Sequence, residues 1–173
     1  MSDLSVNPAP AGGELAELLG TLAQHRQFLR HTVRDLTDEQ AAQRTTASTL
    51  TLGGLIKHVA ATERQWASFL TEGAAAMMGG GTAQWADGFQ MVEGDTLAGL
   101  LDGYEETARR TEALAASLPD LDTAQALPDA PWFPQGLSWT GRRVLLHLIA
   151  ETAQHSGHAD IIRESLDGAK TMA

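Results

Sequence analysis

Residues 140–167, TGRRVLLHLIAETAQHSGHADIIRESLD, carry the strongest structural signal in this chain, because they predict one long helix with polar groups on its inner face. Ser138 or Thr140 can cap its amino end, and Gly168 follows its last residue; such residues commonly bound helices. At 100° per residue, four polar side chains fall within about 80° of one another, on the same side as Val144 and Ile162. These four are His147, Glu151, His155 and His158. Burying them unpaired would cost several kcal/mol, so a bound metal ion is the simplest way to satisfy them.

Spacing limits which of these side chains can share one ion. Glu151 and His155 are four residues apart and lie one helical turn from each other, so both can reach the same ion. His147 is eight residues from His155, roughly 12 Å along the axis, and the two cannot both bind it. Two pairs remain open on spacing alone, Glu151 with His155 and His155 with His158. The motif His-Glu-x-x-His is absent, which excludes the metalloprotease interpretation.

Three further helices are predicted by apolar residues at helical spacing, over residues 14–36, 51–70 and 96–117. Between the first two, Thr37 and Gln40 fit a capping box. The loop 118–137 contains prolines and is expected to lack regular structure. Loop 72–94 is also irregular, and its Trp85, Phe89 and Met91 are expected either to pack locally or to fold back over a pocket.

The fold class predicted is all-α, a four-helix bundle with long connecting loops, in up-down-down-up or up-down-up-down order. His58 lies on the apolar face of the second helix and is the best-placed third ligand for a metal ion between facing helices. Residues 1–13 are expected to form a flexible arm, and residues 14–173 a single domain.

Composition excludes several functional classes. The formal charge of −10 argues against nucleic-acid binding. No apolar run is long enough for a transmembrane span, and the amino end lacks the pattern of a signal peptide, so a cytoplasmic protein is expected. The chain has no cysteine, which excludes disulfides and a cysteine nucleophile. If thiol chemistry occurs here, a small molecule must supply the sulfur.

Two blocks of sequence resemble the DinB/YfiT-like superfamily of metal-binding four-helix bundles. They are residues 51–66, TLGGLIKHVAATERQW, and residues 146–164, LHLIAETAQHSGHADIIRE. The likeness extends over nearly the whole chain, including the order of helices and long loops. It implies that His58, Glu151 and His155 hold a metal ion. Many relatives carry histidine where this chain has Glu151, and the carboxylate is similar to the variant in a mycothiol-dependent maleylpyruvate isomerase.

The resemblance leaves some roles open. Ser156-Gly157-His158 replaces the superfamily's frequent Arg-Gly-Gln, so His158 could brace a ligand, contact substrate or act as an occasional fourth ligand. His147 is expected to be a core histidine or to support a ligand. We expect the Trp85 loop or His158 to contact substrate and Arg26 to hold an anionic group. The apolar loops leave room for a homodimer, which relatives often form.

Two imidazoles and one carboxylate leave open positions on a divalent ion, as catalytic sites require. Zinc suits these ligands best, and nickel, iron or manganese would also accept them. The resemblance implies a metal-dependent enzyme that activates a low-molecular-weight thiol, such as mycothiol or bacillithiol, for S-transfer to an electrophile or for isomerisation. The alternatives are a metal-dependent hydrolase that uses bound water, and a non-catalytic metal-binding stress-response protein.

Overall fold

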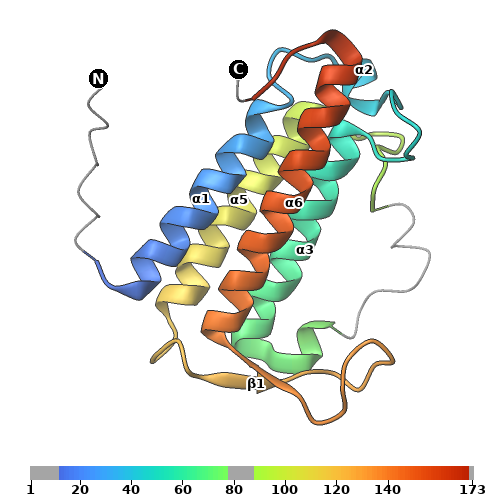
Figure 1. The fold of residues 1–173 in the computed structure, drawn as a ribbon. Coiled ribbons are helices and arrows are strands. Elements are labelled where there is room, and N and C mark those ends of the chain that lie inside the picture. Colours follow the sequence, from blue (N-terminus) through green and yellow to red (C-terminus); the bar gives the residue numbers. More distant parts are fainter. Residues whose placement is uncertain (1–11, 78–87, 172–173) are drawn as a thin grey trace, which may run out of the picture.

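The computed structural model describes residues 12–77 and 88–171, and in these ranges the chain forms the predicted all-α bundle (Figure 1). Its long helices are α1 (Glu14–His31), α3 (Leu52–Glu72), α5 (Leu97–Ala116) and α6 (Gly141–Asp167). The shorter elements are α2 (Asp38–Ala42), η1 (Gly73–Met77), β1 (Ala124–Ala126) and β2 (Ser138–Thr140). Within the described ranges, no helix combines the length and apolarity needed to span a membrane.

The helices run in up-down-down-up order, one of the two orders that the sequence allowed (Figure 1). At the start of α6, Arg142 donates to Glu14 at the start of α1 (2.5 Å), so these two helices are parallel. Helices α3 and α5 are also parallel to each other, since Arg110 late in α5 donates to Ser68 late in α3 (3.1 Å). As a result, α3 packs antiparallel to α6.

Each long helix after the first begins with a threonine whose hydroxyl satisfies a free backbone N–H, as N-caps do. Thr51, Thr96 and Thr140 accept from the N–H groups three residues on, at 3.2, 3.1 and 3.1 Å. Thr140, and not Ser138, is therefore the N-cap of α6. At its other end Gly168 adopts the left-handed conformation (φ 79°), which glycine accepts without steric cost. The predicted capping box of Thr37 and Gln40 is confirmed.

The first helix ends earlier than predicted, at His31 instead of residue 36. The chain turns here because the Arg163 guanidinium from α6 donates to the carbonyl oxygens of Thr32 and Arg34, at 2.9 and 2.8 Å. Asp35 follows in a left-handed conformation (φ 60°), which does not continue a helix. The contact with Arg163, more than 120 residues further along the chain, therefore determines where α1 ends.

The loop 118–137 was predicted to lack regular structure, and that prediction is wrong for β1. Its three residues pair antiparallel with β2, Ala124 opposite Thr140 and Ala126 opposite Ser138. Strands this short show too few residues for an alternating pattern to be recognised in the sequence.

Two clusters of buried apolar residues fill the bundle. The first lies toward the amino end of α3 and includes Leu29, Leu55, Ile56, Tyr104 and Ile162. The second lies toward the carboxyl end of α3 and includes Leu22, Trp66, Phe69, Leu145 and Leu148.

Candidate metal centre

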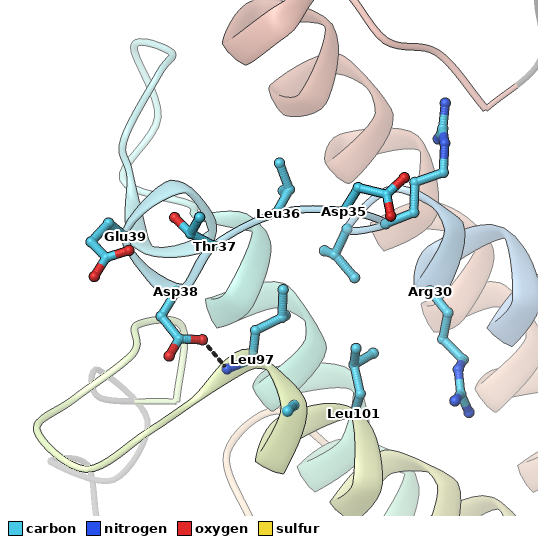
Figure 2. A pocket seen from close by; sticks show the side chains of 11 residues that line it. Arg30, Asp35, Leu36, Thr37, Asp38, Glu39, Leu97 and Leu101 are labelled. Atoms are coloured by element: carbon cyan, nitrogen blue, oxygen red, sulfur yellow. Dashed lines mark hydrogen bonds between the residues drawn. The ribbon is translucent and has the colours of Figure 1, made fainter.

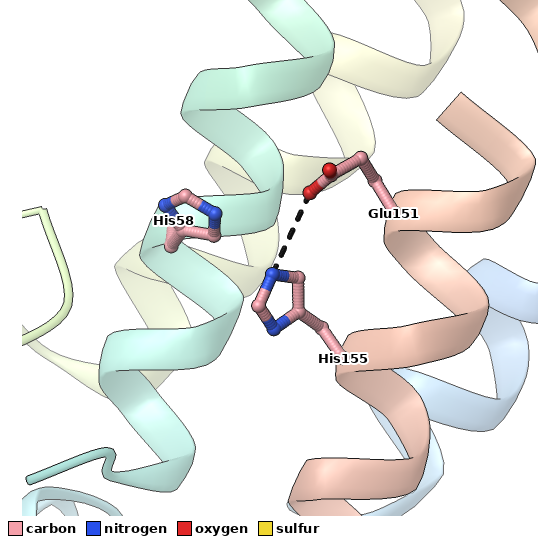
Figure 3. A group of neighbouring side chains, drawn as sticks. All are labelled: His58, Glu151 and His155. Carbon is pink, nitrogen blue, oxygen red and sulfur yellow. Dashed lines mark ion pairs between the residues drawn. The ribbon is translucent and has the colours of Figure 1, made fainter. Parts of the chain in front are cut away.

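Three of the predicted site residues come together between two antiparallel helices. His58 projects from α3, and Glu151 and His155 project from α6 toward it (Figure 3). Each can offer one ligand atom such that all three atoms lie within 4.8 Å of one another. All three side chains are partly buried. The structure therefore contains a group of donors that could hold a metal ion.

The spacing of the donors can be compared with that around a bound ion. Ligand atoms around a tetrahedral zinc ion lie about 3.4 Å apart, because each bond is about 2.1 Å long. Nε2 of His155 lies 3.5 Å from Oε2 of Glu151, already close to that spacing. The ring centroids of His58 and His155 are 4.9 Å apart, with the rings at 75°. Together with the limit of 4.8 Å on the spacing of all three ligand atoms, this places the donors of both helices around one common point.

The protonation states at this centre suit metal binding. Burial lowers the pKa of His58 to about 4, with the neighbouring His155 adding to the effect and Glu151 opposing it. The hydrogen bond from His155 lowers the pKa of Glu151 below its usual value. At neutral pH, His58 is therefore neutral and Glu151 is ionised, which are the forms that bind metal ions.

The two other histidines of this side of α6 flank the group of three. Nδ1 of His158 lies 3.4 Å from Nδ1 of His155, on the opposite side of the ring from Glu151. Nε2 of His147 lies 4.0 Å from Oε1 of Glu151, and burial lowers the pKa of His147. Both therefore adjoin a candidate ligand, and neither belongs to the group of three.

Aromatic side chains border the centre on two sides. Phe89, which the sequence placed either in local packing or over a pocket, stacks on the His58 ring at 3.9 Å between centroids. Toward β2, the rings of Trp66 and Trp139 stack with their centroids 4.5 Å apart, and the His147 ring makes a T-shaped contact with each of them. Trp85 lies outside the described residues.

Arg143, which was not among the predicted site residues, lies beside the aromatic side chains that border the centre. Its guanidinium lies 4.4 Å from the centroid of the Trp139 ring, in the geometry of a cation–π contact. Arg143, His147, Glu151 and His155 follow one another at intervals of four residues, so the same periodicity that identified the other three could have included it.

Arg26 does not occupy the role that the sequence suggested. Its side chain is only 6% exposed, and it donates to both carboxylate oxygens of Glu63, at 3.1 and 2.6 Å. A third donor nitrogen contacts Glu112 at 3.1 Å. The anionic groups that Arg26 binds are therefore the protein's own, and the expectation that it binds a substrate anion is not supported.

An open groove of about 540 Å³ lies at the opposite end of α1 from β1, between α1, α2 and the start of α5 (Figure 2). Two of its charged residues have partners within the protein. Asp38 accepts a hydrogen bond from the backbone N–H of Leu97 (2.7 Å), and Arg30 pairs with Glu105. None of His58, Glu151 and His155 lines it, so the groove is separate from the candidate metal centre.

A comparison with protein-family models gives a match over residues 17–168, to the family described as Mycothiol-S-transferase. The matched range contains the whole candidate metal centre. No curated protein matches the chain.

Proposed function

This chain belongs to the Mycothiol-S-transferase family, and from that premise we propose that it joins mycothiol, through its sulfur, to an electrophilic small molecule at a metal centre held by His58, Glu151 and His155. Membership of this family agrees with the resemblance to the DinB/YfiT-like superfamily and with its link to mycothiol. The observation that carries the proposal is the convergence of the three donors inside a chain of this family.

The three ligands define what the centre can do. Zinc is the ion that we expect, since two imidazoles and one carboxylate suit it. A divalent ion in such a site lowers the pKa of a thiol that binds in its open position, which makes the thiolate available at neutral pH. Glu151 supplies the only negative charge among the three, so the ligand set leaves one unit of positive charge to attract a thiolate.

His158 is proposed to support the centre without binding the ion. His155 faces Glu151 through Nε2, so Nε2 is the atom that we expect to bind. Its Nδ1 is then left to hydrogen-bond with Nδ1 of His158, 3.4 Å away. Such a contact fixes the tautomer and ring orientation of a ligand histidine.

The source of the sulfur follows from the composition. Because the chain contains no cysteine, it cannot form a thioester or disulfide intermediate with a residue of its own. The thiol must come from the small molecule, as the family description indicates. In the proposed reaction the thiolate sulfur forms a bond to the electrophilic carbon, the leaving group departs with its electron pair, and the thiol proton passes to solvent.

Metal content tests the ligand set directly. We expect one equivalent of divalent metal in the purified native chain and a large loss in His58→Ala, Glu151→Ala and His155→Ala, measured by elemental analysis. His31→Ala is the control, since His31 is exposed and outside the centre. Equal metal content in all five proteins would overturn the proposed site.

Thiol dependence tests the reaction. With monobromobimane as the electrophile, we expect mycothiol conjugation above the uncatalysed rate in the native protein, and a return to that rate in Glu151→Ala or after chelation. The hydrolase alternative predicts product formation from ester or amide substrates without any thiol. Metal binding with neither activity would favour the non-catalytic alternative.

A further inference from the structure

Residues 88–95 are fixed along the amino-terminal half of α3. The Lys57 ammonium of α3 donates to the Asp95 carboxylate (2.8 Å) and to the carbonyl oxygen of Gln90 (3.3 Å). The Asp95 carboxylate also accepts from the backbone N–H of Val92 (2.9 Å). Lys57 therefore holds this segment against α3 at two points, Gln90 and Asp95.

Two glycines in the first turns of α3 allow the segment to approach this closely. A Cβ atom added at Gly54 would lie 1.8 Å from the carbonyl oxygen of Phe89, and one at Gly53 would lie 2.3 Å from Sδ of Met91. Both distances are far below van der Waals contact. At Gly54 the clash is with the backbone of Phe89, so a side chain there would push the segment off the helix, whereas at Gly53 only the Met91 side chain would have to move. The Gly53-Gly54 pair, one turn before His58, thus brings Phe89 next to that histidine.

As a result, the Phe89 ring stacks on the imidazole of His58, a candidate metal ligand. The two rings are 3.9 Å apart between centroids and within 20° of parallel. The His155 ring is further off, at 6.3 Å and a tilt of 55°. A stacked ring at van der Waals distance covers one face of the imidazole and resists rotation about its χ2 bond, which is otherwise soft.

We propose that Phe89 is a positioning residue of the metal centre, which holds the His58 imidazole in the plane from which its nitrogen reaches the ion. This inference rests on the ligand set proposed above. Phe89 acts through His58, in the way that supporting residues around metal sites orient their ligands and strengthen binding. Gly54 serves the same end, since it lets the backbone of Phe89 lie against the helix.

Metal titration of four variants tests this role. Competition with a chromophoric chelator gives the Kd for Zn²⁺, and the visible absorption of bound Co²⁺ reports the geometry of the centre. We expect Phe89→Ala to weaken metal binding by about 10-fold and Phe89→Leu, which keeps bulk but not a flat ring, by several-fold. Phe89→Tyr keeps the stacking ring and should bind like the native chain. The visible absorption of bound Co²⁺ should change in the Ala and Leu variants only.

Met91→Ala is the matched control. Met91 belongs to the same segment and its side chain lies against α3 at Gly53, but it has no ring that could stack on His58. We expect it to lower the melting temperature about as much as Phe89→Ala and to leave the metal Kd unchanged.

The outcomes separate this inference from the proposed function. If the native chain binds neither ion, the ligand set fails and the inference fails with it. If the native chain binds metal and the Ala and Leu variants bind it equally well, only the role of Phe89 is overturned. Equal weakening in Met91→Ala would also overturn it, because the effect would then come from the segment's packing. Should Phe89→Ala not fold, Phe89→Leu and Phe89→Tyr still provide the comparison.

Discussion

Among single side chains, the buried pair of Arg26 and Glu63 shows how this bundle tolerates charge in its interior. The Glu63 side chain is 1% exposed, and its carboxylate accepts from two nitrogens of Arg26 and from the Thr111 hydroxyl (2.7 Å). These contacts join α1, α3 and α5. Removal of one partner would leave a desolvated charge, which costs much more than the pair contributes.

We therefore expect Glu63→Ala to lower the free energy of unfolding by about 3–5 kcal/mol, because it leaves the Arg26 guanidinium buried with only Glu112 as partner. Urea denaturation followed by circular dichroism measures this. Glu106→Ala is the control: Glu106 pairs with Arg109 on the surface, with both side chains more than 60% exposed, and should change stability by less than about 0.5 kcal/mol. Similar losses in the two variants would contradict this account.

His58 makes stability depend on pH in the metal-free protein. Its pKa is about 4 in the folded chain and 6.5 in the reference state. As pH falls from 6.5 to 4, the unfolded chain binds a proton at His58 that the folded chain does not, so stability decreases through this window. After allowance for partial exposure, we expect a loss of about 1–2 kcal/mol.

Denaturant unfolding at pH 7 and at pH 4.5, in the presence of a chelator, tests this. In His58→Gln, residue 58 cannot be protonated. The free energy of unfolding of this variant should therefore fall less between pH 7 and pH 4.5 than that of the native chain, by about the 1–2 kcal/mol expected for His58. His31→Gln should follow the native chain. An identical pH dependence in His58→Gln and the native chain would show that His58 does not contribute.

The sequence predicted side-chain chemistry well where partners are close along the chain and poorly where they are not. The interval of four between Glu151 and His155 predicts their proximity on any helix. Arg26 has partners 37 and 86 residues away, and no local pattern identifies them. The choice of His58 as third donor came from its apolar helix face and from the resemblance, since spacing cannot link residues of different helices.

For the helices and strands, boundaries set by local caps were predictable. Thr51, Thr96 and Thr140 each accept from a backbone N–H three residues away, and each appears in the sequence directly before an apolar periodic segment. The end of α1 was not predictable, because Arg163 from α6 stabilises the turn. Strand β1 was missed because its partner β2 lies 14 residues further along the chain.

The Thr140 cap should matter because α6 carries two of the proposed ligands. We expect Thr140→Ala to cost about 1 kcal/mol through loss of the hydrogen bond to the Arg143 N–H. Thermal unfolding measures the change. Thr140→Ser keeps the hydroxyl and should retain nearly all of the stability. If serine and alanine lose equally, the hydroxyl of Thr140 is not a cap that stabilises the protein.

In the molecule as a whole, the long connection between α3 and α5 makes these helices parallel and leaves α3 antiparallel to α6. The sequence allowed two helix orders, because apolar periodicity defines helices but not their directions. The structure settles the order through contacts between helix ends, such as Arg142 with Glu14. This arrangement is what places His58 opposite Glu151 and His155.

An ion bound by His58, Glu151 and His155 would join α3 to α6 and stabilise the folded state by mass action. At a free Zn²⁺ concentration 1,000 times Kd, we expect a gain of about 4 kcal/mol, which raises the melting temperature by roughly 10 °C. Differential scanning calorimetry with and without chelator measures this. The double variant His58→Ala/Glu151→Ala should show no shift on zinc addition, and an undiminished shift would place the ion elsewhere.

The separation of the donors along the chain has a consequence for biosynthesis. Glu151 follows His58 by 93 residues, a length that a ribosome translates in about 5–20 s. Throughout that interval the nascent polypeptide displays one imidazole of the three donors, too few to retain an ion against cellular competitors. Loading of the proposed ion would therefore wait until the final helix has emerged and docked, and would be among the last events in maturation.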